Sequence, residues 1–121
     1  MLSDCHILVV EDEIITALEL VTILTREGAI VIGPAQSVPE ALRFVANNSI
    51  DCAILDIELI GGSSFAIADA LADHRVPFLF VTGYDDGRIP PRHREKPAIA
   101  KPFAHNSILQ AVDGLVSRCI G

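Results

Sequence analysis

The chain has 121 residues, the length of one ordinary domain, and half of them are apolar with a mean hydropathy of +0.45, so it can bury a core and lacks the composition of a disordered chain. Sixteen acidic residues against nine basic ones give a net charge of −7, which argues against nucleic acid and anionic membranes as partners, because both need a basic face. Three scattered cysteines fit a reduced compartment, and no apolar run approaches the roughly 18 residues of a membrane span, so a cytoplasmic protein is expected.

Short β-branched runs alternate along the chain with longer stretches of helical apolar spacing. Residues 6–10 form a continuous apolar run of strand length, and over residues 14–27 apolar positions recur with helical spacing. Gly28 stands where this helix is expected to end, because glycine readily adopts the left-handed conformation found there. Residues 29–35 follow as the second predicted strand.

A capping box predicts the start of the second helix. Ser37 stands at the cap position and Glu40 follows three residues later, with a proline in the first turn, so a helix is expected through about residue 47. The next predicted elements continue the alternation: a strand at 51–56, a glycine-containing loop at 57–63, a helix that begins at Ser63 or Ser64 and runs to about 73, and a strand at 77–82.

Residues 83–97 differ from the rest of the chain, because they are rich in glycine and proline and show almost no apolar periodicity. We expect a loop there, with at most a short or broken helix. A short fifth strand at 98–100 and a last helix from about 105 to 118 complete the predicted elements.

This alternation predicts one α/β domain over residues 1–121. Consecutive β-α units pack as a parallel sheet with helices on both faces, and strands that are apolar throughout are typical of such a sheet, since both of their faces are buried. Five strands in this length match a flavodoxin-like, doubly wound fold with strand order 2-1-3-4-5 and about five helices, the fourth of them short or irregular.

Polar residues gather where the predicted strands end. Glu11 and Asp12 follow the first strand, and Asp56 ends the third. Thr82 ends the fourth strand, and Lys101 follows the fifth. In a doubly wound sheet the carboxyl ends of the strands form the functional crevice, so these side chains are expected to converge. Neighbouring carboxylates repel one another unless a cation joins them, and Mg²⁺ or Mn²⁺ prefers such oxygen ligands. With a lysine and a threonine opposite, the pattern predicts a phosphoryl-transfer site.

Four segments at these strand ends carry a family resemblance. They are Val9-Val10-Glu11-Asp12-Glu13, Ile54-Leu55-Asp56, Val81-Thr82-Gly83 and Lys101-Pro102-Phe103. With them, the whole chain resembles the receiver domains of bacterial two-component response regulators. Each motif alone is a weak signal, but their correct order along the predicted strand ends makes the match specific.

The resemblance implies a phosphorylation site. Asp56 corresponds to the aspartate that forms an acyl phosphate, and Lys101 corresponds to the lysine that binds the phosphoryl group. Thr82 corresponds to the threonine whose hydroxyl turns toward a phosphoryl oxygen. The Lys101–Pro102 peptide bond is expected to be cis, as it is in the family.

The resemblance also implies the ligands of a magnesium ion. Asp12 and Asp56 would bind the ion directly, Glu11 would act mainly through water, and the backbone carbonyl of Glu58 would supply a further oxygen. The Glu58 side chain occupies a position that tunes the lifetime of the acyl phosphate in the family, where an acid either repels or orients water. The simpler interpretation of that side chain is a solvated loop carboxylate.

The chain departs from the common receiver pattern beside the threonine and the lysine. Many receivers carry Tyr or Phe three residues before the lysine, where this chain has Ala98. An aromatic residue instead follows the threonine, in Phe80-Val81-Thr82-Gly83-Tyr84, which is similar to the FATGUY subclass of receivers. We therefore predict that Thr82 and Tyr84, with the irregular segment 83–97, carry the conformational response.

Two features of the first predicted helix have simple interpretations. Glu13 is interpreted as an acidic residue at a helix N-terminus, where the helix dipole favours it. Ile15, Leu20 and Ile23 lie outside the main apolar stripe. The apolar surface of the helix is therefore wider than the core stripe alone. It indicates either a deeply buried helix or a face that contacts a partner.

The leading hypothesis is a receiver without an output domain. A histidine kinase or a histidine phosphotransfer protein would donate a phosphoryl group to Asp56, and the signal would pass to an unknown downstream protein by contact, or the domain would act as a phosphate sink. The chain would catalyse only its own phosphorylation and dephosphorylation and would not otherwise be an enzyme. Two alternatives stay open: a small haloacid-dehalogenase-like phosphatase, suggested by Asp56-Ile57-Glu58, and a receiver-like binding scaffold that is not phosphorylated.

Overall fold

The computed structural model describes residues 2–59, 62–83 and 89–120, and in them five parallel strands form a central sheet. These strands are β1 (His6–Val10), β2 (Ile30–Ala35), β3 (Cys52–Asp56), β6 (Phe78–Thr82) and β7 (Ala98–Ala100). Their order across the sheet is β2-β1-β3-β6-β7. This is the predicted order 2-1-3-4-5 when the strands of the sheet are numbered among themselves, so the flavodoxin-like, doubly wound fold is confirmed.

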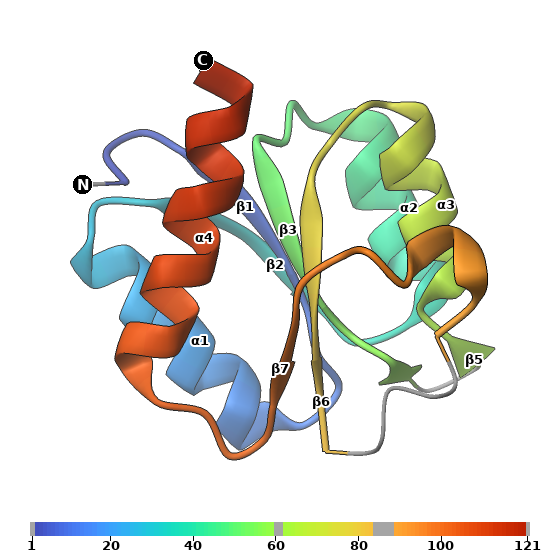
Figure 1. Ribbon diagram of the computed structural model, residues 1–121, viewed down its shortest axis with the longest axis horizontal. Coiled ribbons are helices and arrows are strands. Elements are labelled where there is room, and N and C mark those ends of the chain that lie inside the picture. Colours follow the sequence, from blue (N-terminus) through green and yellow to red (C-terminus); the bar gives the residue numbers. More distant parts are fainter. Residues whose placement is uncertain (1, 60–61, 84–88, 121) are drawn as a thin grey trace.

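Among the described residues, four α-helices cover the two faces of the sheet (Figure 1). α1 (Ile14–Arg26) and α4 (His105–Ile120) lie on one face, and α2 (Val38–Asn47) and α3 (Phe65–Asp73) lie on the other. Successive side chains of a strand point to opposite faces. Ile54 of β3 therefore packs on the α1 and α4 side, whereas its neighbour Leu55 packs on the α2 and α3 side, and both are fully buried.

Local sequence signals set two of the helix ends. Gly28 follows α1 with a φ of +92°, a backbone conformation that other residues rarely adopt. At the start of α2, the Glu40 N–H donates to Ser37 Oγ at 3.3 Å, and the Gln36 N–H donates to Glu40 Oε1 at 2.8 Å. The predicted Ser37 cap is therefore formed, while the Glu40 side chain accepts from the residue before the cap rather than from Ser37 itself. Ser64 precedes α3 as predicted, but its side chain makes no capping hydrogen bond.

Two details of the structure differ from the predicted elements. The segment 57–63 is more than a loop, because its described residues form a small antiparallel hairpin of β4 (Glu58–Leu59) and β5 (Gly62–Ser63). The expected short fourth helix is a single 3₁₀ turn at Pro91–His93, so the described part of the chain has four α-helices rather than five. The prolines of this segment lack the N–H donors that a longer helix requires.

The face of α1 that extends beyond the core stripe is divided between the two predicted interpretations. Leu20 and Ile23 are buried against the sheet, which supports the deeply buried helix. Ile15 is instead 83% exposed. Ile14 and Leu18, which the helical spacing of apolar residues predicts to face the core, are also exposed, at 63% and 58%. The first turns of α1 therefore present large apolar side chains to solvent, at the end of the helix that lies nearest the strand ends.

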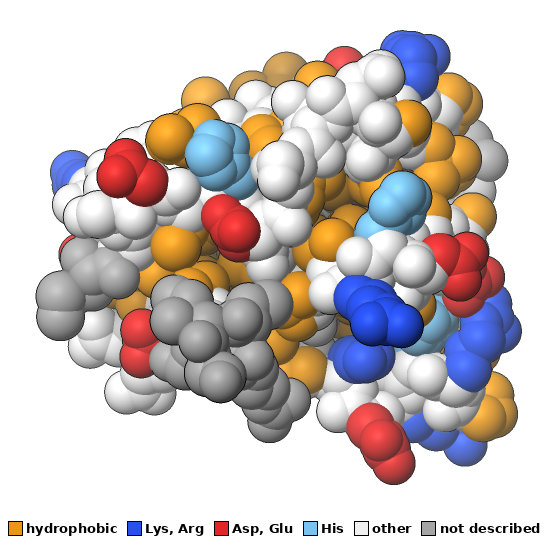
Figure 2. All heavy atoms as spheres, turned by 90° about the horizontal axis from the view of Figure 1, so that it is seen from above, with side chains coloured by type: hydrophobic (Ala, Val, Ile, Leu, Met, Phe, Trp, Pro, Cys, Tyr) orange, Lys and Arg blue, Asp and Glu red, His pale blue; other side chains and the backbone are white. Residues whose placement is uncertain are grey.

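The two ends of the molecule differ in the elements that they expose. The chain termini lie at one end (Figure 1), and Figure 2 shows acidic, basic and hydrophobic side chains interspersed over that end. The strands terminate at the opposite end, where the cis Lys101–Pro102 bond also lies, as predicted. No helix in the described ranges combines the length and the apolar character needed to cross a membrane.

Candidate functional site

The predicted site residues lie together at the carboxyl ends of the strands. Glu11 and Asp12 directly follow β1, and Asp56 is the last residue of β3. Thr82 ends β6, and Lys101 directly follows β7. The Lys101 N–H donates to the Thr82 carbonyl oxygen at 2.8 Å. Because the strands are parallel, residues far apart in the sequence reach one edge of the sheet, as the strand-end argument predicted.

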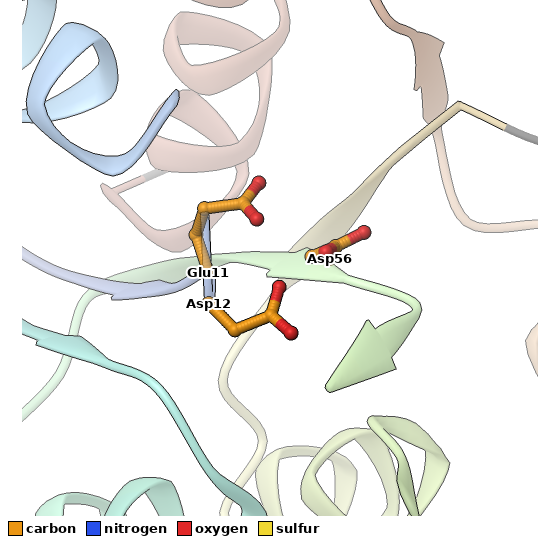
Figure 3. Close-up of side chains that lie close together, drawn as sticks. All are labelled: Glu11, Asp12 and Asp56. Atoms are coloured by element: carbon orange, nitrogen blue, oxygen red, sulfur yellow. The ribbon is translucent and has the colours of Figure 1, made fainter. Parts of the chain in front are cut away.

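Three of these residues form a carboxylate cluster (Figure 3). Glu11, Asp12 and Asp56 each offer a carboxylate oxygen, and these oxygens lie within 4.8 Å of one another. Glu11 is fully buried and Asp56 is 8% exposed, while Asp12 is partly exposed. Figure 3 shows Glu11 and Asp12 extending from the end of β1 toward Asp56 on β3. So many carboxylates in so little space favour protonation of one of them or the binding of a cation.

Lys101 supplies an ammonium group to this cluster. Its Nζ lies 2.8 Å from Glu11 Oε1 and 3.5 Å from Asp56 Oδ2. A third carboxylate, that of Glu13, accepts a hydrogen bond from Nζ at 3.2 Å. One positive charge is therefore shared by three acidic side chains, and Asp12 adds a fourth acid beside them.

The crowding changes the proton affinities at the site. Burial, and then the negative charge of Glu11, raise the pKa of Asp56 to about 7, against the opposite influence of Lys101. Burial by itself would lower the pKa of Lys101, but its contact with Glu11 and the charge of Asp56 outweigh burial and raise that pKa. Lys101 is therefore firmly charged, while the Asp56 carboxyl is held near the point where it is half ionised at neutral pH.

A pocket of about 430 Å³ opens at the cluster. Its lining residues are Asp12, Glu13, Asp56, Glu58, Gly83 and Lys101. The predicted site residue Glu58 lies on β4 with an exposed side chain, so the hairpin places it beside the pocket. Thr82 is buried at the end of β6. Tyr84, the other predicted switch residue, lies outside the described residues.

Glu13 has a contact that the sequence interpretation missed. Its carboxylate makes no capping hydrogen bond to α1, although Glu13 stands at the cap position of that helix. It accepts a hydrogen bond from Lys101 instead, across a separation of 88 residues. Neither spacing nor helix periodicity carries a signal for such a contact, because it exists only after β1 and β7 have been placed in the same sheet.

The donor set fits a hard divalent cation. Glu11, Asp12 and Asp56 offer oxygen ligands from neighbouring strands, which is the ligand chemistry that Mg²⁺ prefers. Burial, and then the negative charge of Glu11, raise the pKa of Asp56 in spite of Lys101, so an ionised Asp56 is costly here without a further positive charge. A cation beside these carboxylates would remove that repulsion.

Sequence comparison matches most of the chain to a known family. A family model described as the response regulator receiver domain matches residues 7–113. Among curated proteins, the phyllosphere-induced regulator PhyR of Methylorubrum extorquens is 38% identical over 103 residues. That match covers 81% of this chain but only 38% of PhyR. The chain thus spans well under half the length of this relative.

Solved structures resemble the fold over nearly the whole chain. SdrG from Sphingomonas melonis Fr1 superimposes with a TM-score of 0.83 at 37% identity, covering 96% of this chain and 99% of SdrG. The response regulator TrrA from Thermotoga maritima, in complex with Mg²⁺ and BeF, has a TM-score of 0.81 at 26% identity. That superposition covers 92% of this chain and 98% of TrrA.

Proposed function

The chain belongs to the response regulator receiver domain family, and from that premise we propose that Asp56 accepts a phosphoryl group from a phosphohistidine donor. The donor would be a histidine kinase or a histidine phosphotransfer protein. The observation that carries the proposal is the buried Asp56 carboxylate, which lies 3.5 Å from Lys101 Nζ and lines the pocket. Receiver domains are modules of two-component signalling, and the relatives named above are bacterial.

The proposed reaction moves a phosphoryl group from nitrogen to oxygen. A carboxylate oxygen of Asp56 attacks phosphorus, and the bond between phosphorus and the histidine nitrogen breaks. The imidazole leaves with the electron pair of that bond, while its other ring nitrogen keeps its proton. The product is an acyl phosphate on Asp56, and the reaction requires Asp56 in its ionised form.

Three further side chains have proposed roles around this step. Lys101 would turn its ammonium group from the neighbouring carboxylates to a phosphoryl oxygen, which carries much of the charge in the transition state. The Thr82 hydroxyl would donate to another phosphoryl oxygen once the group is in place. The Glu58 side chain would meet water that approaches the acyl phosphate, because it is exposed at the pocket.

The same residues would hold a divalent cation. We propose Asp12 and Asp56 as direct ligands of Mg²⁺ or Mn²⁺, Glu11 as a ligand through water, and the Glu58 carbonyl as a further ligand. When bound, the ion would neutralise charge on the carboxylates and on the phosphoryl oxygens. The structure of TrrA with Mg²⁺ and BeF supports this assignment from a relative at 26% identity.

The first turns of α1 are the proposed contact surface for the phosphoryl donor. Ile14, Ile15 and Leu18 are exposed there, directly after Glu13 at the pocket. A protein that delivers a phosphoryl group to Asp56 would cover these apolar side chains and bury their surface.

We propose that residues 1–121 act as one receiver domain in the cytoplasm, with output through contact with another protein or as a phosphate sink.

The test is phosphorylation by a small donor, followed by intact mass. The protein is incubated with acetyl phosphate and Mg²⁺, and an added mass of one phosphoryl group is expected. The variant Asp56→Asn should lose this addition, because its amide is not a nucleophile. Asp73→Asn is the matched control, since it makes the same change at an exposed position at the end of α3, and it should be phosphorylated like the unmodified protein.

Other outcomes would identify the other functions. Repeated hydrolysis of phosphate esters that depends on Asp56 would indicate a small phosphatase rather than a receiver. No phosphoryl uptake from a small donor or from phosphohistidine, together with no binding of beryllofluoride, would contradict the proposal and favour a scaffold that is not phosphorylated.

A further inference from the structure

Glu13 is fixed at the mouth of the pocket by backbone contacts at the start of α1 and by side-chain contacts that do not cap the helix. Its backbone N–H donates to Glu11 Oε2 at 3.1 Å, and its carbonyl accepts the first helical hydrogen bond of α1, from Ala17. Its Oε1 accepts hydrogen bonds from Lys101 Nζ at 3.2 Å and from Thr16 Oγ1 at 3.3 Å. Two donors on different elements therefore hold this carboxylate over the pocket that it lines.

The position of Glu13 has two physical consequences. Its side chain is 64% exposed, so its negative charge faces solvent at the entrance, unlike the buried charge of Glu11. It also competes for the ammonium group that must reach the phosphoryl oxygens, since Lys101 Nζ lies closer to Glu13 (3.2 Å) than to Asp56 (3.5 Å). Both consequences oppose the entry of a small anion.

We infer that Glu13 is a specificity-determining residue that disfavours free anionic phosphodonors relative to a protein donor. This inference rests on the proposed function of Asp56. A small donor must bring its own negative charge past Glu13 and must draw Lys101 away from it. A protein donor approaches with a surface, and basic or hydrogen-bonding groups on that surface can pair with Glu13 while the phosphoryl group enters. Glu13 touches no reacting atom and acts through its charge and through Lys101.

Comparing donors of different charge distinguishes electrostatic repulsion by Glu13 from a purely structural role of this side chain. Acetyl phosphate carries two negative charges near neutral pH, whereas phosphoramidate carries one, so repulsion by Glu13 should penalise acetyl phosphate more. An exposed charge within several ångströms of a dianion, screened by moderate salt, changes its local concentration by roughly three- to tenfold. For a monoanion, the same Coulomb and screening argument predicts about the square root of that factor.

The experiment compares the second-order rate constant of phosphorylation for both donors, with Mg²⁺, at low and high ionic strength. Glu13→Gln keeps an acceptor oxygen for Lys101 but removes the charge. Glu19→Gln is the matched control, because it removes the same charge from an exposed position of α1 outside the pocket lining. Circular dichroism establishes that each variant is folded before the assay.

Glu13→Gln is expected to raise the rate constant roughly three- to tenfold with acetyl phosphate and clearly less with phosphoramidate, and high salt should shrink both gains. Glu19→Gln should change neither rate constant appreciably. Equal gains with both donors, a loss of rate, or an equal gain in Glu19→Gln would each overturn the inference while leaving the phosphorylation of Asp56 intact. If the unmodified protein accepts no phosphoryl group at Asp56, the proposed function itself fails and the inference fails with it.

Discussion

Replacing Asp56 by Asn should stabilise the fold, and the gain should depend on pH. Burial and the charge of Glu11 raise the pKa of Asp56 from 3.8 to about 7. Between about pH 4 and pH 7 the folded chain therefore keeps a proton that the unfolded chain has lost, so stability falls as pH rises through this window. A shift of about three pKa units corresponds to at most about 4 kcal/mol, since each unit is worth about 1.4 kcal/mol. Asn has nearly the same volume without the charge, so we expect a gain of about 2–4 kcal/mol at pH 8 and little at pH 4.

The assay is urea unfolding followed by circular dichroism, with chelator present, for both proteins at several pH values. The difference between the two free energies of unfolding reports Asp56 together with its electrostatic interactions with Glu11 and Lys101, because the remaining titrating groups are common to both. A difference that is equal at pH 4 and pH 8, or that favours the unmodified protein at pH 8, would refute the reasoning. Saturating Mg²⁺ should narrow the gap by stabilising the unmodified protein, by about 1.4 kcal/mol at ten times the dissociation constant.

Three other substitutions test a second contact at the site and two contacts elsewhere in the fold. Lys101→Met should lower the free energy of unfolding by about 2 kcal/mol at pH 8, because it leaves buried carboxylates without their cation; unchanged urea midpoints would contradict this. Asp69→Asn should lower the Tm by roughly 3 °C near neutral pH, since Asp69 accepts from Arg92 Nε at 2.8 Å and lies 2.7 Å from His93 Nε2. The hydrogen bonds from Arg92, and to a smaller extent the hydrogen bond with His93, lower the pKa of Asp69 to about 2. The lower Tm of Asp69→Asn is therefore expected above about pH 4 and should vanish as pH falls through 2. A lower Tm that persists in acid would argue against the ion pair. Ser37→Ala should cost about 1 kcal/mol by removing the cap of α2, measured by urea unfolding, and Ser37→Gly should restore most of it.

The strands and helices of the main fold could be predicted from the sequence because their signals are local. The apolar runs and helical spacings place each strand of the sheet and each α-helix within two residues of its observed bounds. The hairpin of β4 and β5 was missed, since each of its strands has two residues, too few to show any period. The glycine- and proline-rich composition of residues 83–97 correctly predicts that no long helix forms there, and the described residues contain a single 3₁₀ turn.

The contacts of His93 also could not be predicted from local sequence. The histidine carries no sequence pattern of a ligand, yet it is only 3% exposed. Its ring packs edge-on against Phe78 and Phe80, and its Nε2 faces Asp69 on α3. These contacts attach the segment after β6 to α3, and no residue in its own neighbourhood indicates them.

What the sequence determined by itself is the doubly wound fold and the edge of the sheet where the acidic residues meet Lys101. Strand ends follow from local hydrophobicity, and the parallel topology then places all of them together. What only the tertiary structure decided is how the one ammonium group of Lys101 is shared, and so why Glu13 belongs to the pocket rather than only to its helix. The sharing of this ammonium group depends on distances of a few ångströms between side chains at the carboxyl ends of β1, β3 and β7, which no spacing along the chain encodes.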